Sequence, residues 1–127
     1  MKAVAWFSGF SVDDSNNAKD FYMQALGLVL RDETMGLKFE LPGGGDVFIY
    51  QKPGHQPASF TILNFVVENI DETVDELTGL GVEFERYDNM PAAQDEKGIL
   101  RGRSVNQGPD IAWFKDPAGN ILSVLQD

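Results

Sequence analysis

SVDDSNNAKDFYMQALGL, residues 11–28, decides the fold. It begins in an apolar segment, residues 3–12 (AVAWFSGFSV), whose aromatic and β-branched residues predict a strand. Asp13 and Asp14 then offer helix caps, and Gly27 is placed to end a helix. The apolar residues between them recur at i, i+3, i+4, i+7 and i+8, at Ala18, Phe21, Tyr22, Ala25 and Leu26. The stretch therefore predicts a strand followed by an amphipathic helix.

The same pattern returns further along the chain. Residues 61–68 (TILNFVVE) predict a second strand, Asn69 a second helix cap, and Gly81 the end of a second helix. Val12 corresponds to Val67 at an offset of 55 residues. A repeat of this length indicates that one supersecondary unit occurs twice.

Three further strands are predicted after each helix. They span residues 28–34, 36–41 and 46–51 in the first half, and 82–87, 109–115 and 120–126 in the second. The second half also carries an insertion of about twenty residues at 88–108, and loops of that length are usually functional or mobile.

The pattern predicts an α+β fold, in which two tandem βαβββ modules form a curved mixed sheet. That sheet would make a cup, with the helices on its outer face. We expect one domain over residues 1–127, with module 1 at 1–52, a Pro/Gly-rich linker at 53–60 and module 2 at 61–127.

Composition restricts the partners. The chain has 127 residues, with 10 Lys and Arg against 20 Asp and Glu, and a net charge of -10. This acidity disfavours nucleic acid and anionic membranes, keeps a protein soluble, and would attract a cationic ligand. No segment has the ~20 apolar residues that span a bilayer, and no signal peptide is evident, so we expect a cytoplasmic protein. The absence of cysteine excludes disulfides and a Cys nucleophile.

The chain resembles the vicinal oxygen chelate superfamily, which includes glyoxalases, bleomycin-resistance proteins and extradiol dioxygenases. Two motifs carry the resemblance, SVDDSNNAKDFYMQALGL and FKDPAGNILSVLQ at residues 114–126. The resemblance extends over essentially the whole chain. It implies a homodimer that builds ligand grooves between its chains. It also implies that metalloenzyme members carry four ligands, typically His, Glu or Gln, on the first and last strands of each module.

Carried over by register, those ligand positions hold Phe7, Ile62 and Ser123, with Phe48 or Ile49 as the fourth. None of these is a metal ligand of the required kind, so we expect no metal and no cofactor. The single histidine, His55, lies in the linker, where we expect an exposed residue rather than a ligand or a base.

Strand alternation and the insertion supply the candidate ligand-binding residues, which are Phe7, Phe48, Tyr50, Asn64, Arg101, Arg103, Trp113 and Ser123. Asn64 bonds either neighbouring backbone or a ligand. Tyr50 and Trp113 either stack on a planar or cationic ligand or fill the core. Arg101 and Arg103 either close over an anionic ligand or face solvent on a mobile lid.

These observations predict a metal-independent small-molecule-binding protein of the glyoxalase/bleomycin-resistance type, which sequesters an aromatic or cationic compound. No carboxylate pair suited to acid/base catalysis is evident, and we assign no catalytic residue. The alternative is a glyoxalase-like lyase, isomerase or dioxygenase whose ligands lie elsewhere. A third possibility is an interaction module that uses the cup only to dimerise.

Overall fold

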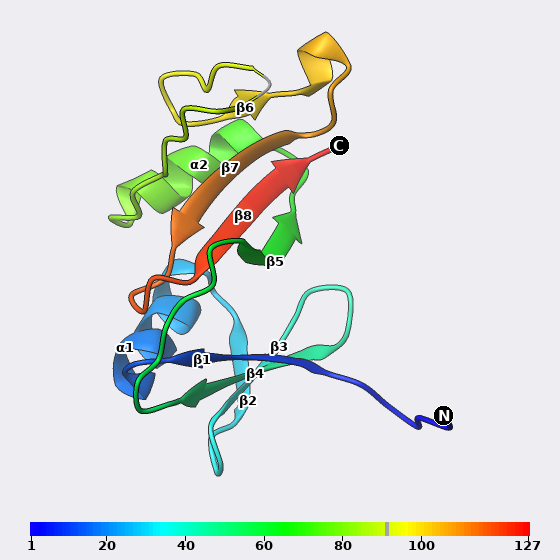
Figure 1. The fold of residues 1–127 in the computed structure, drawn as a ribbon, viewed down its shortest axis with the longest axis vertical. Coiled ribbons are helices and arrows are strands. Elements are labelled where there is room, and N and C mark those ends of the chain that lie inside the picture. The colour runs from blue at the N-terminus through cyan, green and yellow to red at the C-terminus, as the bar shows by residue number, and fades with distance from the viewer. Residues whose placement is uncertain (91) are drawn as a thin grey trace. The chain divides into compact units, whose positions relative to one another are not determined.

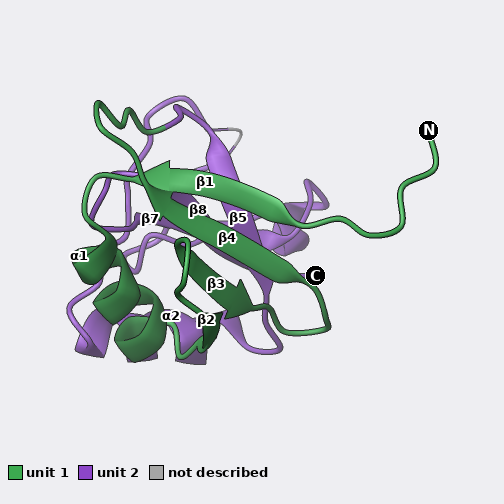
Figure 2. Cartoon of the chain, turned by 90° about the horizontal axis from the view of Figure 1, so that it is seen from below, with its two compact units in different colours: residues 1–57 green, residues 58–127 purple. Residues whose placement is uncertain are grey.

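The computed structural model describes residues 1–90 and 92–127. The chain divides into two compact units, Met1–Pro57 and Ala58–Asp127, which Figure 2 colours separately. Each unit contains one four-stranded mixed sheet with a helical segment after its first strand. The α+β class and the two tandem βαβββ modules are therefore confirmed.

The first unit follows the predicted order of elements (Figure 1). The elements are β1 (Ser8–Val12), α1 (Ser15–Asp20), the π-helical turn η1 (Phe21–Ala25), β2 (Val29–Asp32), β3 (Leu37–Glu40) and β4 (Asp46–Gln51). Its strand order is β1-β4-β3-β2, with β1 parallel to β4 and the other pairs antiparallel. The parallel pair needs a crossover, and the chain makes it through α1, η1, β2 and β3.

The predicted cap and stop of the first helix are both present. Asp14 has extended backbone angles, and its carboxylate accepts a hydrogen bond from the Asn17 amide at 3.0 Å. Gly27 follows η1 with a φ of 67°, a conformation that glycine adopts without steric cost. The residues between them place Ala18 and Tyr22 against the sheet, where both are buried.

An aromatic cluster forms the core of the first unit. The Tyr22 ring lies 6.0 Å from the Phe10 ring and 5.8 Å from the Phe39 ring, measured between centroids. The aliphatic part of this core consists of Val12, Leu37, Val47 and Ile49. Because alternate residues of β4 point to opposite faces, the burial of Val47 and Ile49 leaves Phe48 and Tyr50 on the other face.

The second unit repeats the arrangement (Figure 1). Its elements are β5 (Thr61–Val66), α2 (Ile70–Gly79), β6 (Leu100–Arg101), the 3-10 turn η2 (Arg103–Val105), β7 (Asp110–Lys115) and β8 (Ile121–Gln126). The strand order is β5-β8-β7-β6, with β5 parallel to β8. The core between α2 and this sheet includes Ile70, Val74, Leu77, Ala112, Phe114, Leu122 and Val124.

The Asn69 cap of α2 gives a testable prediction. Its side-chain oxygen accepts a hydrogen bond from the Glu72 amide at 3.1 Å, so Asn69→Ala leaves that amide without its acceptor. We expect Asn69→Ala to lower the free energy of unfolding by about 1 kcal/mol in urea titrations followed by circular dichroism. Asn69→Asp keeps the acceptor and is the matched control. Equal losses in the two variants would show that the cap contributes nothing.

The prediction of a strand at residues 82–87 was wrong. In the structure this segment makes only an isolated bridge between Phe84 and Phe114, and the Glu85 amide donates to the Trp113 carbonyl at 2.8 Å. The strand that pairs with β7 is β6, from within the insertion, and it pairs at Asp110 and Ile111. Beside this segment, the side-chain nitrogen of Gln94 from the insertion donates to the Glu85 and Gly98 carbonyls and occupies the place of a strand partner.

The first predicted strand, residues 3–12, is also shorter than expected. Pairing with β4 begins only at Ser8, and the residues before it extend away from the unit (Figure 1). Trp6 in this arm is 82% exposed. No helical segment in the described part of the chain has the length and hydropathy of a membrane span.

Candidate functional site

Each sheet has one face covered by its helix and one face opposite, which we call the open face. On the open face of the first unit, Phe7, Phe48 and Tyr50 form a contiguous aromatic row. The Phe7 and Phe48 rings meet edge to face at 6.4 Å, and the Phe48 and Tyr50 rings stack at 5.8 Å with 22° between their planes. Phe7 is 67% exposed and Tyr50 38% exposed, so the row presents aromatic surface to solvent.

The row bears on a register question that the sequence left open. Phe48 and Ile49 were both possible for the fourth superfamily ligand position. Ile49 is fully buried on the helix side of β4, whereas Phe48 lies on the open face. Of the two residues, Phe48 is therefore the one that shares the open face with Phe7.

A polar pair lies next to the row. The Ser11 hydroxyl and Nδ1 of His55 are 2.7 Å apart. Ser11 is in register with Tyr50 across the β1–β4 pair, so the two side chains point to the same open face. The prediction that His55 is an exposed linker residue was wrong, because its ring is half-buried and hydrogen-bonded to β1. In the sequence, Ser11 near the end of the strand was the one sign of a polar partner for His55.

The open face of the second unit brings three other candidates together. Asn64 and Trp113 each lie in register with Ser123, one on either side of it in the sheet. The Ser123 hydroxyl donates to the Asn64 side-chain oxygen at 2.5 Å. The partner of Asn64 is therefore a neighbouring side chain, where the sequence had offered backbone or a ligand.

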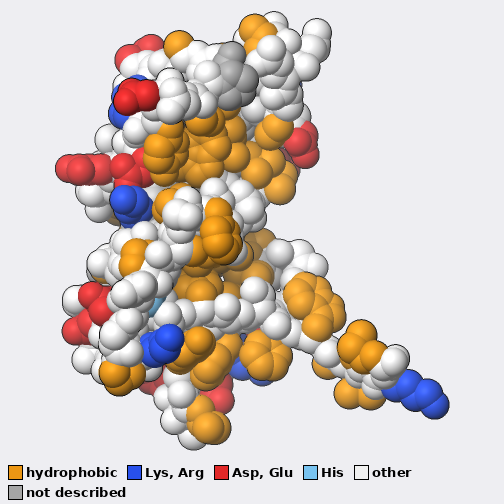
Figure 3. Space-filling model, viewed as in Figure 1, with side chains coloured by type: hydrophobic (Ala, Val, Ile, Leu, Met, Phe, Trp, Pro, Cys, Tyr) orange, Lys and Arg blue, Asp and Glu red, His pale blue; other side chains and the backbone are white. Residues whose placement is uncertain are grey.

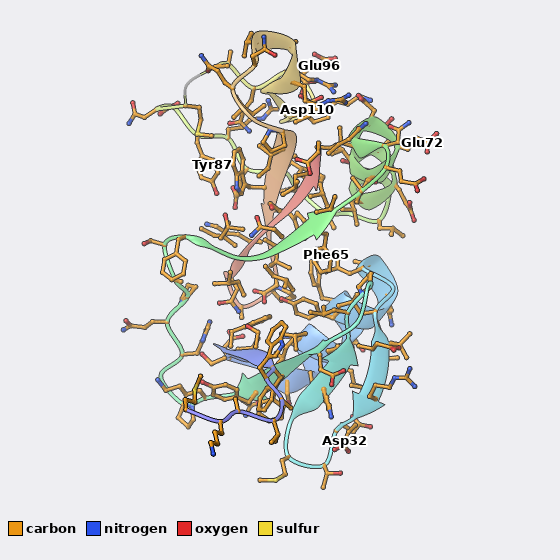
Figure 4. All side chains as sticks on the ribbon, turned by 90° about the vertical axis from the view of Figure 1, so that its right-hand side faces the viewer. Asp32, Phe65, Glu72, Tyr87, Glu96 and Asp110 are labelled. Atoms are coloured by element: carbon orange, nitrogen blue, oxygen red, sulfur yellow. The ribbon has the colours of Figure 1, made fainter. Side chains whose placement is uncertain are left out.

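Tyr87 completes this face and was missed from the sequence. Its ring meets the Trp113 ring edge to face at 5.6 Å. Tyr87 is labelled in Figure 4. Partial burial raises the pKa of the Tyr87 phenol, and the charge of Glu85 raises it further. The only sign of Tyr87 in the sequence was its position, as the aromatic residue just before the insertion. Figure 3 shows hydrophobic side chains gathered over β7 and β8.

Arg101 lies in a network of carboxylates. Its guanidinium donates two hydrogen bonds to Asp71 of α2, at 2.7 and 3.0 Å, and one to Asp95 at 3.0 Å. These hydrogen bonds, with the charges of Arg101 and Lys97, lower the pKa of Asp71 to about 2, against the partial desolvation that raises it. The network holds part of the insertion onto α2.

Arg103 is placed differently. Its backbone amide donates to the Asp110 carboxylate at 3.1 Å, and its guanidinium lies 4.0 Å from that group. The segment of the insertion around Arg101 is thus anchored, although residue 91 lies outside the described residues. Contact of either arginine with a ligand stays a prediction.

A cleft of about 480 Å³ lies on the helix side of the second unit, away from the open face. It is lined by Val74, Asp75, Thr78, Val82, Glu83, Phe84, Arg86, Glu96 and Lys97. Its cations have partners in the protein, since Lys97 bonds to Asp75 at 3.0 Å and Arg86 donates to the backbone carbonyls of Asp95 and Glu96. We interpret this cleft as the seam between α2 and the insertion.

By register, the resemblance places the superfamily's metal-ligand positions at Phe7, Phe48 or Ile49, Ile62 and Ser123. Among residues 1–90 and 92–127, no three His, Cys, Asp or Glu side chains gather into a group that could hold a metal ion. A serine hydroxyl alone is a poor ligand for the first-row metals that need converging nitrogen, sulfur or carboxylate donors. The residues at these positions therefore do not fit a metal centre.

The protein is an α+β protein with two tandem βαβββ modules. Each module has an open sheet face opposite its helix. The chain belongs to the Glyoxalase/Bleomycin resistance protein/Dioxygenase superfamily, whose family model matches residues 4–124. The resemblance drawn from the two motifs is thereby confirmed.

Several solved structures have the same fold, and the similarity covers nearly the whole chain. An antibiotic-binding protein, TnmS3, from a Streptomyces species is 24% identical, with 99% of this chain and 98% of that chain covered and a TM-score of 0.65. The fosfomycin resistance protein FosX from Listeria monocytogenes is 15% identical, with 100% and 95% covered and a TM-score of 0.70. A superfamily member from Sphaerobacter thermophilus is 23% identical, with 98% of each chain covered and a TM-score of 0.65. No curated protein sequence matches the chain.

Proposed function

We propose that this protein binds and sequesters a small aromatic or cationic molecule without using a metal. The observation that carries the proposal is the exposed aromatic row of Phe7, Phe48 and Tyr50. Exposed, mutually packed aromatic rings offer a flat apolar surface and a negative quadrupole, which suit a planar ring or an organic cation. The net charge of -10 favours a cation further.

Two further observations support this function. The superfamily ligand positions carry Phe7, Phe48 and Ile62 instead of histidines or carboxylates, which favours binding over metal-assisted catalysis. One neighbour of the same fold is described as an antibiotic-binding protein and another as a fosfomycin resistance protein. As such relatives are commonly dimeric, we also propose a homodimer, and we propose that the protein acts in the cytoplasm.

Binding of a planar aromatic cation tests the proposal. We expect proflavine to bind the native protein, because the aromatic row offers both stacking and cation–π contacts. Replacing both Phe48 and Tyr50 with serine removes two ring contacts and is expected to weaken binding about tenfold or more. Fluorescence titration gives the affinities, and light scattering on the same sample tests for a dimer of the 14.0 kDa chain.

Phe60→Ser is the matched control, because Phe60 is 67% exposed and lies outside the aromatic row. Equal affinity in the native protein and the double variant would contradict the proposal. Elemental analysis of the purified native protein provides a second test. One divalent metal ion bound per chain would reject metal independence and favour the lyase, isomerase or dioxygenase alternative.

A further inference from the structure

Three side chains on the open face of the second unit combine aromatic surface with a hydrogen-bond donor. The Trp113 and Tyr87 rings lie 5.6 Å apart with 73° between their planes, so they form two walls of a corner. Asn64 lies two strands away from Trp113, with Ser123 of β8 in register between them. Tyr87 is 37% exposed, Asn64 is exposed and Trp113 is half-buried, so a small molecule can reach all three.

Ser123 orients the side-chain amide of Asn64. Ser123 is fully buried, and its hydroxyl donates to the side-chain oxygen of Asn64. That bond engages the amide oxygen and leaves the amide nitrogen, which can donate two hydrogen bonds. Within the part of the chain that the structure describes, this nitrogen has no hydrogen-bond partner. The open face therefore presents an oriented donor as well as two aromatic rings.

The insertion holds Tyr87 against Trp113. The side-chain oxygen of Gln94 accepts from the Tyr87 backbone amide at 2.7 Å, and its side-chain nitrogen donates to the Glu85 carbonyl at 2.9 Å. The Glu85 amide in turn donates to the Trp113 carbonyl at 2.8 Å. Because the backbone before and at Tyr87 is tied to both β7 and the insertion, little ordering of this segment is needed when a ligand binds.

The charges at this face disfavour an anionic ligand. Lys115 follows Trp113 by two residues on β7 and shares its face, and its ammonium group lies 3.5 Å from the Glu85 carboxylate. The raised pKa of the Tyr87 phenol is due first to burial and then to the negative charge of Glu85. A carboxylate ligand would compete with Glu85 for Lys115, whereas an uncharged carbonyl oxygen needs only a donor such as the Asn64 amide.

We propose that Trp113, Tyr87 and Asn64 form a second binding site, which takes uncharged aromatic compounds that carry a carbonyl oxygen. The aromatic part packs in the corner between the two rings, where stacking on one ring and edge contact with the other are both available. The carbonyl oxygen accepts from Asn64. The two outer strands, β5 and β7, are roughly 10 Å apart, twice the spacing of neighbouring strands, and the compound spans that distance. All three residues belong to the second unit, so binding here does not depend on the aromatic row of the first.

Two probes of the same shape test this site, 2-acetylnaphthalene and 2-isopropenylnaphthalene, because the second has a methylene group in place of the carbonyl oxygen. We expect the native protein to bind 2-acetylnaphthalene about fivefold to tenfold more tightly, the usual net effect of one hydrogen bond. Asn64→Leu keeps the size of the side chain and removes the donor, so the preference is expected to fall to about twofold or less. Asn16→Leu, at an exposed asparagine of α1, should keep the native preference.

Titrations followed by ¹⁵N-resolved NMR measure the affinities and locate the probe, because the Trp113 indole N–H and the Asn64 side-chain amide each give a signal of their own. Trp6 is the other tryptophan of the chain and is 82% exposed in the N-terminal arm, so its indole signal is the internal control. Trp113→Leu is expected to weaken both probes about tenfold, and Trp6→Leu should change neither affinity.

The preference is a ratio of two affinities within one variant, so a general loosening of the fold lowers both affinities and leaves the ratio unchanged. Equal binding of the two probes by the native protein, or a full preference retained in Asn64→Leu, would overturn the second site. Shifts of the Phe48 and Tyr50 amide signals with an unchanged Trp113 indole signal would also overturn it and leave the proposed function standing. Failure of 2-acetylnaphthalene to bind would overturn the second site alone, because the proflavine titration tests the aromatic row separately.

Discussion

Replacing Phe39 with alanine is expected to lower the free energy of unfolding by about 3–5 kcal/mol, the largest effect we predict. Phe39 is fully buried in the middle of β3, where it pairs with Leu30 on one side and Val47 on the other. Its ring packs on Tyr22 at 5.8 Å between centroids. Alanine would lose the transfer free energy of the ring and leave a cavity that the paired strands cannot close.

Urea unfolding followed by circular dichroism measures this loss. Phe60→Ala removes the same ring from a site that is 67% exposed, and we expect it to change the free energy of unfolding by less than about 0.5 kcal/mol. Phe39→Leu keeps most of the volume and should cost less than Phe39→Ala. A loss below about 1 kcal/mol for Phe39→Ala would show that this core is not packed as described.

The second large effect is expected at Arg101. Its side chain is 34% exposed, but it neutralises Asp71, Asp95 and, at 3.7 Å, Asp110, whose own side chain is only 10% exposed. Arg101→Gln leaves these three carboxylates without this cation. We expect a loss of about 2 kcal/mol at neutral pH, a figure already reduced for solvent screening at the exposed end of the network.

The same variant has a predicted pH signature. The pKa of Asp71 lies at about 2, below its usual value of 3.8, chiefly because Arg101 donates hydrogen bonds to it. A carboxyl whose pKa is lowered by folding stabilises the native state above the unfolded pKa, and it loses that contribution as pH falls through the folded one. The native protein should therefore lose this contribution between about pH 4 and pH 2, and Arg101→Gln should show a flatter profile there.

Arg31→Gln is the matched control for Arg101. Arg31 bonds Glu40 at 2.6 Å, a distance as short as any in the Arg101 network, but both side chains are about half exposed. Exposed ion pairs contribute little, so we expect a change of less than about 0.5 kcal/mol. Equal losses at Arg31 and Arg101, or parallel pH profiles for native protein and Arg101→Gln, would contradict the network as described.

Much of the candidate site followed from strand alternation. The rule that alternate residues share a face predicted that Phe7, Asn64 and Ser123 face the cup, but it left the face of Tyr50 open because the glycine insertion obscures the phase of its strand. The structure places Tyr50 in the aromatic row through Phe48 and joins Asn64 to Ser123 by a hydrogen bond. It also shows that His55 belongs beside Ser11, which alternation cannot reveal, because a turn rather than a strand positions it.

The sequence by itself determined the repeat, the α+β class and both helix caps. These features depend on periodicity and on residues a few positions apart, such as Asp14 with Asn17 and Asn69 with Glu72. Only the tertiary structure decided that residues 82–87 keep a single bridge to β7 while β6 pairs with its first residues, and that Arg101 pairs with Asp71. Both depend on contacts between residues distant in the chain, whose energies no local pattern records.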